Sequence, residues 1–176
     1  MDAIKCINTR RSIRKYKNKK IPADIIKQLI TAGSNAPSSM NDQPWVFITI
    51  TKRQTIANLT KVKAQLSKFI GTAPLIIACC YDETKSRSKA HNLENVALAA
   101  ENILLTCNAL KLGACYVTAF DSRFPEIEKS IIKELKLPKN VKPVCLISIG
   151  YPDQKPGIKK MRPLKEIWNK EYYGSN

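Results

Sequence analysis

The chain has 176 residues, of which 44% are hydrophobic and 25% are charged, a balance typical of a globular protein rather than a disordered one. No apolar run approaches the ~20 residues that a membrane-spanning helix needs, and the opening segment MDAIKCINTRR lacks the apolar stretch of a secretory signal. We therefore expect a single domain over residues 1–176 that needs no disulfide or metal, in the cytoplasm and without membrane contact.

The formal net charge is +16, and the basic residues are concentrated near the start of the chain. Residues 1–68 carry 14 Lys and Arg against three acidic residues, most densely in RRSIRKYKNKK (10–20). Such an excess attracts anions, which include nucleic acid, a membrane surface and the phosphate of a small ligand. Composition alone does not choose among these partners.

Hydrophobic periodicity predicts alternating helices and strands, with no internal repeat. Helices are expected at residues 2–8, 22–32, 53–70, 91–111 and 124–136, and strands at 45–51, 74–81, 114–120 and 142–150. Residues 35–44, rich in Asn, Ser and Pro, are expected to form a loop.

Two features indicate a second subunit. The helix expected at 91–111 is apolar on nearly every face between Val96 and Leu110, so it should be buried on all sides. One small domain does not provide that much cover. The tail 151–176, rich in Pro, Lys and Tyr, cannot build a core of its own, and we expect it to wrap over another surface such as a partner subunit.

Several chemistries are disfavoured by what the chain lacks. Its six cysteines show no C-x-x-C pair and its single histidine, His91, lies in a polar segment, so a metal site or a Cys-His nucleophile is not expected. No cysteine lies in an activating motif, and we expect none to be catalytic. Neither a G-x-x-x-x-G-K-[ST] phosphate loop nor a G-x-G-x-x-G fingerprint is present.

Groups suited to phosphate lie near both ends of the chain, in Arg10-Arg11-Ser12-Ile13-Arg14 and Lys160-Met161-Arg162. The planar fork of arginine and the hydroxyl of serine match phosphate oxygens. The loop PSSMNDQPW adds amides and hydroxyls that could contact the polar edge of a planar ring. Taken singly, these pieces are equally compatible with solvated basic runs and an ordinary Pro-bounded turn.

Together and in this order, four segments resemble the FMN-dependent nitroreductase family: RRSIRKY (10–16), APSSMNDQPWVF (36–47), NVALAAENILLTCNALKLGACYV (95–117) and ISIGYP with KKMRPLKEI (147–167). The resemblance implies an α+β, three-layer sandwich in which helices flank a mixed, mainly antiparallel sheet. It also implies a homodimer with two FMN sites at its interface and exchanged C-terminal tails.

Carried over by position, the resemblance assigns FMN contacts to four parts of the chain: the first basic segment, the 36–47 loop, the end of the strand at 114–120, and the tail. The resemblance also covers an amide and a lysine beside the pyrimidine edge of the flavin. The residues are Arg10, Arg11, Ser12, Arg14, Pro37, Ser38, Ser39, Asn41, Gln65, Lys68, Val117, Thr118, Lys160 and Arg162.

The chain departs from the family pattern at four positions, with Asn95 for a frequent Asp, Ala97 for Gly, Tyr116 for Trp and Thr118 for Gly. Thr118 would narrow the space over the flavin ring, which leaves the size of the acceptor open. The identity of the substrate is therefore not carried over.

The function implied is an FMN-dependent NAD(P)H oxidoreductase, in which NADH or NADPH reduces the flavin and a nitroaromatic, quinone, enone or flavin then takes the electrons. No catalytic residue is assigned, because the flavin carries the redox chemistry. Two alternatives stay open: a basic nucleic-acid-binding module that uses residues 10–20, and a flavin-binding protein without turnover. Flavin colour and NAD(P)H oxidation would separate the three.

Overall fold

The structure is a computed structural model that describes residues 2–62 and 68–175. Five α-helices and four strands lie within these residues. The helices are α1 (Ala3–Thr9), α2 (Ala23–Ser34), α3 (Arg53–Val62), α4 (Asn92–Ala109) and α5 (Pro125–Glu134). The strands are β1 (Trp45–Ile50), β2 (Leu75–Asp82), β3 (Gly113–Thr118) and β4 (Val141–Gly150).

The four strands form one sheet in the order β1-β2-β4-β3, and each neighbouring pair is antiparallel. The central pairing places Cys79 opposite Cys145, next to a bulge in the register. A parallel contact comes from outside the strands, where Ser12 bridges Ala114 at the start of β3. The expected mainly antiparallel sheet is confirmed.

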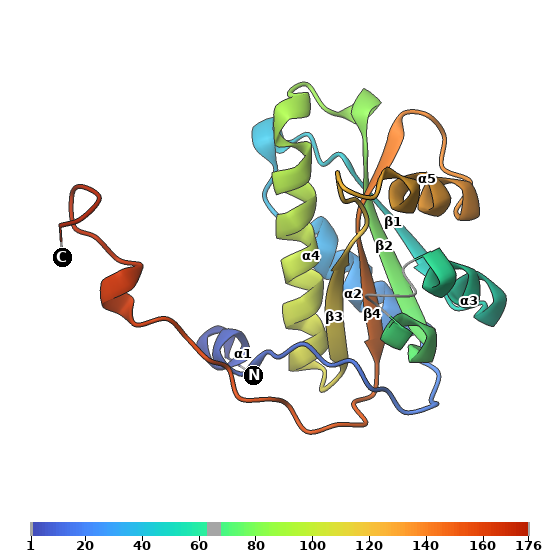
Figure 1. The fold of residues 1–176 in the computed structure, drawn as a ribbon, viewed down its shortest axis with the longest axis horizontal. Coiled ribbons are helices and arrows are strands. Elements are labelled where there is room, and N and C mark those ends of the chain that lie inside the picture. The colour runs from blue at the N-terminus through green and yellow to red at the C-terminus, as the bar shows by residue number, and fades with distance from the viewer. Residues whose placement is uncertain (1, 63–67, 176) are drawn as a thin grey trace.

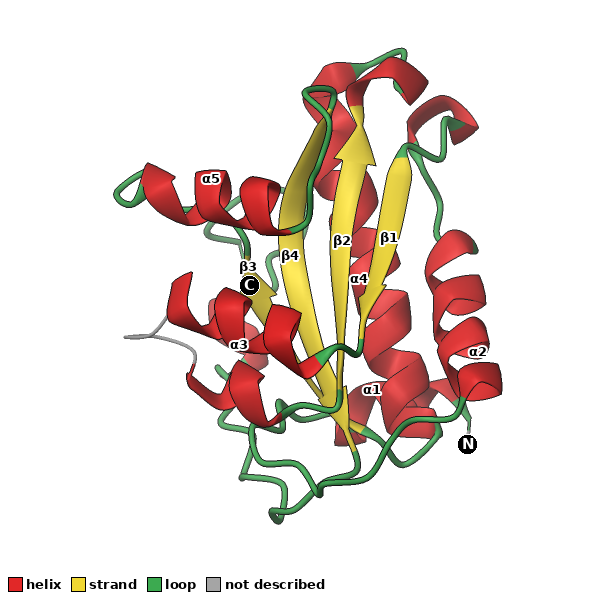
Figure 2. Ribbon diagram, turned by 90° about the vertical axis from the view of Figure 1, so that its right-hand side faces the viewer, coloured by secondary structure: helices red, strands yellow, loops and turns green. Residues whose placement is uncertain are grey.

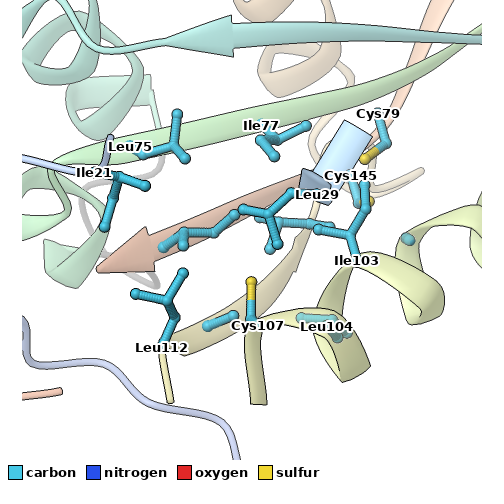
Figure 3. Packing of buried hydrophobic residues seen from close by; sticks show 14 of the residues in the cluster. Ile21, Leu29, Leu75, Ile77, Cys79, Ile103, Leu104, Cys107, Leu112 and Cys145 are labelled. Atoms are coloured by element: carbon cyan, nitrogen blue, oxygen red, sulfur yellow. The ribbon is translucent and has the colours of Figure 1, made fainter. Parts of the chain in front are cut away.

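Helices cover both faces of the sheet, α2 and α4 on one side and α3 and α5 on the other (Figures 1 and 2). Alternate residues of β2 face the two hydrophobic cores, one on each side of the sheet. Ile77 packs with Leu29 of α2 and Ile103 of α4 (Figure 3), and Ile76 belongs to the core on the opposite side. This period of two is why the strand reads as a continuous apolar run in the sequence. The expected three-layer α+β sandwich is confirmed.

One expected element differs in the structure. Of the helix predicted at 53–70, the structure describes α3 over Arg53–Val62, and residues 68–72 form a 3₁₀ turn. The Nη2 of Arg53 donates to the carbonyl of Gly71 at 2.6 Å, whereas a continuous helix would separate these residues by about 27 Å. The chain therefore folds back onto the start of α3, which periodicity alone does not reveal.

The helix expected to be buried on all sides is only partly covered within one chain. Val96, Ala99 and Ile103 of α4 are buried, but Leu98 is 47% exposed. The tail that follows β4 extends away from the sheet (Figure 1). Within it, Tyr173 is 99% exposed. Within the described ranges, no helix has the length and apolar character needed to cross a membrane.

Candidate functional site

The basic segment 10–14 lies along the first residues of β3. Ile13 donates its backbone N–H to the carbonyl of Ala114 at 3.0 Å. The approach is close because Gly113 has no side chain: a Cβ there would lie 2.6 Å from Cγ2 of Ile13. The sheet edge thus fixes the backbone from which Ser12 and Arg14 project.

Tyr16 anchors the same segment to β4. Its hydroxyl lies 2.8 Å from the Oγ of Ser148 and donates to the carbonyl of Ile13. Tyr16 and Ser148 are both buried, and burial raises the pKa of the Tyr16 phenol well above its ordinary value. The only aromatic residue of 10–20 is therefore a structural anchor and offers no surface for base stacking.

The three arginines of the segment have different partners. Arg10 lies 3.4 Å from the carboxylate of Glu101. Arg11 donates to three backbone carbonyls, including that of Gly157 at 3.2 Å. Arg14 is exposed, with its guanidinium 5.7 Å from the centre of the Phe69 ring.

A cavity of about 350 Å³ opens beside this segment. Its lining includes the cations Arg10, Arg11 and Lys111 and the amide of Asn108. Nearby, burial raises the pKa of the Cys115 thiol, while Arg14 and a hydrogen bond with Ser12 partly oppose the rise. The cavity lining also includes apolar residues such as Leu104 and Leu112, so it is the guanidinium and hydroxyl donors of residues 10–14, and not the cavity as a whole, that suit an anion such as phosphate.

The loop after α2 has an unusual backbone. Met40, Asn41 and Gln43 have φ values of 53°, 56° and 50°, in the left-handed region that L-residues adopt only when the surroundings hold them. Here the holding contacts are a hydrogen bond from the Gln43 N–H to the Oγ of Ser38 at 3.0 Å and contacts from Arg87.

Arg87 is a component of the site that sequence reasoning missed. Its Nε donates to the Oδ1 of Asp42 at 2.6 Å, and its Nη2 donates to the carbonyl of Met40. Hydrogen bonds from Arg87 hold the pKa of the Asp42 carboxyl below its usual range. Arg87 lies 45 residues from Asp42 in a polar connection, so no local pattern links the two.

Asn95 of α4 joins the helix to this loop. Its Oδ1 accepts the backbone N–H of Ser39 at 2.9 Å, and the residue is only 3% exposed. Its Nδ2 has no partner among the described residues. Pro37, Ser38, Ser39 and Asn95 line a shallow cavity of about 240 Å³. Of the four predicted loop residues, Asn41 is not part of this lining.

The remaining predicted residues lie elsewhere. Val117 is buried and Thr118 is exposed at the end of β3, where the Thr118 hydroxyl donates to the Phe120 carbonyl at 3.1 Å. Lys68 begins the 3₁₀ turn whose next residue, Phe69, contacts Arg14. Gln65 lies outside the described residues.

Lys160 and Arg162 lie in the exposed tail, where Arg162 lies 3.3 Å from the carboxylate of Glu166. No hydrogen bond joins them to residues 10–14 in the part of the chain that the structure describes. The single chain therefore does not bring the two phosphate-suited segments into contact through these side chains.

The loop and the basic segment lie at opposite ends of α4 (Figure 1). Ser39 bonds Asn95 near its beginning, whereas Asn108 near its end donates to the Oγ1 of Thr9 at 2.9 Å. Thirteen residues of helix correspond to about 20 Å. Within one chain, the predicted loop contacts and the basic segment are therefore separated by most of the length of α4.

A family model described as the Nitroreductase family matches residues 7–69 and 61–151. The chain belongs to the nitroreductase family. This confirms the resemblance inferred from the four sequence segments.

Individual relatives agree over nearly the whole chain. A provisionally named NADH oxidase from Clostridium acetobutylicum is 37% identical, with a TM-score of 0.87 over 95% of this chain and 99% of that one. An FMN-dependent nitroreductase from Clostridium difficile R20291 is 30% identical, with a TM-score of 0.81 over 98% and 99% of the two chains. A provisionally named NADH dehydrogenase/NAD(P)H nitroreductase from Methanothermobacter thermautotrophicus is 29% identical over 161 residues, 92% of this chain and 83% of the relative.

Proposed function

We propose that the chain is an FMN-dependent NAD(P)H oxidoreductase that works as a homodimer. It takes electrons from NADH or NADPH and passes them to a nitroaromatic, quinone, enone or flavin acceptor. Membership of the nitroreductase family supports the oxidoreductase class. The similarity to an FMN-dependent nitroreductase from C. difficile supports FMN as the cofactor. The observation that carries the dimer is the separation of the two half-sites along α4.

The donors of the first half-site fit the phosphate of FMN. Ser12 supplies a hydroxyl, and Arg10 and Arg14 supply guanidinium groups. Arg10 lines the cavity beside the segment, whereas Ser12 and Arg14 lie near Cys115. A phosphate dianion is best held by several such charge-assisted hydrogen bonds. Lys160 and Arg162 of the tail are proposed to complete this cradle.

The second half-site supplies the loop over the flavin. Pro37, Ser38, Ser39 and Asn41 sit on a backbone that Asn95 and Arg87 hold in place. Because this loop lies about 20 Å along α4 from the basic segment, we assign it to the flavin held by a second copy of the chain.

Val117, Thr118 and Lys68 are proposed to lie beside the flavin ring, together with Gln65. FMN, when bound, would supply the redox chemistry between the nicotinamide and the acceptor. The protein binds and orients it. A cation such as Lys68 would stabilise the negative charge of reduced flavin, and no side chain is assigned as a catalytic acid.

A second chain also accounts for the apolar surface that one chain leaves open. Leu98 on α4 and Trp168 and Tyr172 in the tail are each at least 47% exposed. We propose that residues 1–176 form one domain whose tail, 151–176, wraps over the partner, burying well over ~2,000 Å² as obligate dimers do. A cytoplasmic location stays a prediction.

The absorbance spectrum of the purified protein tests the function, recorded before and after anaerobic addition of NADH and of NADPH. A flavin spectrum that bleaches with either nucleotide, and recovers when a quinone is added, is the expected result. A colourless protein that takes up no added FMN would refute the proposal. A bound flavin that neither nucleotide reduces would favour a flavin-binding protein without turnover.

A further inference from the structure

The basic segment and the beginning of the tail lie side by side. Tyr16 bridges Pro152, the Lys17 N–H donates to the Tyr151 carbonyl at 2.9 Å, and the Asp153 N–H donates to the Lys15 carbonyl at 2.9 Å. The Arg14 N–H continues the series, donating to the Oε1 of Gln154 at 3.0 Å. Residues 14–17 and 151–154 are therefore joined mainly through their backbones.

Arg11 extends this pairing with its side chain. Its Nε donates to the carbonyl of Gly157 at 3.2 Å, and its Nη1 donates to the carbonyls of Asn8 and Arg10, both at 2.8 Å. One guanidinium thus ties the end of α1, the basic segment and the tail together. Of the five N–H donors of a guanidinium, three donate to these carbonyls, and only the two on Nη2 remain for a phosphate.

Gly157 is the last tail residue held in this way. Among the described residues, the hydrogen bonds of 158–175 all lie within that segment, as in the contact between Arg162 and the Glu166 carbonyl at 3.0 Å. Lys160 and Arg162 follow Gly157 by three and five residues. The direction in which the tail leaves Gly157 consequently sets where these two cations can reach.

We propose that Arg11 is a positioning residue that latches the tail at Gly157 and so directs Lys160 and Arg162 toward the FMN phosphate. This inference rests on the proposed function, and it gives Arg11 a role different from the direct FMN contact that the family resemblance implies. Arg11 acts on the cofactor through the tail, while Ser12 and Arg14 act on it directly.

Lys15 offers a matched control. It belongs to the same segment and carries the same charge, but its exposed side chain takes no part in the pairing, which uses only its backbone carbonyl. Lys15→Ala therefore removes one positive charge and leaves the latch in place. Arg11→Ala removes one positive charge together with the latch.

The test is a double-mutant cycle on FMN affinity. Dissociation constants are measured for the full-length wild type, Arg11→Ala, the double variant Lys160→Ala/Arg162→Ala, and the combined triple variant. In the wild-type background, Arg11→Ala should weaken FMN binding about tenfold, because a misdirected tail loses one charge-assisted contact between its cations and the phosphate. In the Lys160→Ala/Arg162→Ala background, Arg11→Ala should weaken FMN binding less than about twofold, because the tail then has no cations for the latch to direct.

Hydrogen–deuterium exchange supplies a second readout that needs no FMN. Arg11→Ala should speed exchange of the amides of residues 153–158 in protein whose Tm stays close to that of the wild type, and Lys15→Ala should not. Equal losses of FMN affinity in both backgrounds would overturn the proposal and make Arg11 a direct phosphate ligand. Unchanged exchange would also overturn it. A wild type that bound no FMN would refute the proposed function instead, and exchange would still decide whether Arg11 holds the tail.

Discussion

The backbone N–H of Ser39 donates to the side-chain oxygen of Asn95 at 2.9 Å, joining the loop after α2 to the first turns of α4. The residues are 56 positions apart in the sequence. Because Asn95 is buried and Ser39 is half-buried, this hydrogen bond is partly shielded from water and ties the loop to the helix.

Asn95→Ala should destabilise the protein by about 1–3 kcal/mol, since it leaves the Ser39 N–H without its acceptor. For a chain of this size the Tm falls by about 2–4 °C per kcal/mol. Asn92→Ala is the matched control, because Asn92 lies on the same helix and is equally buried, but its amide has no partner among the described residues. A Tm loss as large for Asn92→Ala would show that the Ser39 bond contributes little.

The ion pair between Arg87 and Asp42 predicts a pH dependence. Hydrogen bonds from Arg87 lower the pKa of Asp42 in the folded state, so the pair stabilises the fold above the unfolded pKa of about 4. This contribution disappears as the pH falls through the lowered, folded-state value. The Tm difference between wild type and Arg87→Ala should therefore be constant near neutral pH and shrink below about pH 4.

A neighbouring lysine provides the comparison for this pH series. Lys89 is exposed in the next turn and pairs with no carboxylate in the described part of the chain. Lys89→Ala should leave the shape of the Tm–pH curve unchanged. If Arg87→Ala and wild type differed by the same amount at pH 3 and pH 7, the Arg87–Asp42 pair would not be the source.

Substitution by Ala should have opposite consequences at Gly113 and at Gly157. A Cβ at Gly113 would lie 2.6 Å from Ile13, whereas a Cβ at Gly157 meets nothing within 4 Å. Gly113→Ala should cost about 1–3 kcal/mol of stability through overpacking and should weaken FMN binding, because it displaces the segment that carries Ser12 and Arg14. Gly157→Ala should change neither quantity. Equal Tm values for the two variants would contradict the close packing of Ile13 on β3.

Much of the fold follows from local sequence patterns. The β2 run LIIACCYD and the amphipathic spacing of Ile25, Ile26 and Leu29 each point to one element type, and the structure has both elements. The turn at 68–72 was not predictable, because it depends on Arg53 bonding to a carbonyl 18 residues away.

The site was predictable to a different degree. The loop and the basic segment were proposed by resemblance. In the structure, the loop is held against α4 through Asn95, and the basic segment is held against β3 through Ala114. Their separation by α4 and the pairing of Arg11 with Gly157, 146 residues apart, are tertiary relationships. No sequence period carries such information, so these features needed the structure.

The proposed phosphate contact of Arg14 predicts selectivity between flavins. Arg14→Ala should weaken FMN binding roughly 10- to 150-fold, from a loss of about 1.5–3 kcal/mol, and should leave riboflavin binding nearly unchanged. Lys15→Ala should alter FMN affinity only slightly and in a salt-dependent way. Titration of both refolded apo-variants with FMN and with riboflavin measures this. Equal losses for both variants would indicate a general anion-binding surface and revive the nucleic-acid hypothesis.

We propose that each FMN site combines the basic segment of one chain with the loop of another. Arg10→Ala/Arg14→Ala damages the first half-site, and Ser39→Ala/Asn41→Ala damages the second, so each variant alone should bind FMN weakly. A mixed dimer concentrates all four substitutions in one site and restores the other to wild type. Refolding the two variants together and measuring bound FMN and NAD(P)H oxidation tests the claim most directly. Our account predicts that the purified mixed dimer regains one wild-type-affinity FMN site and about half the wild-type activity. A mixed dimer that binds FMN no better than its parents would contradict it.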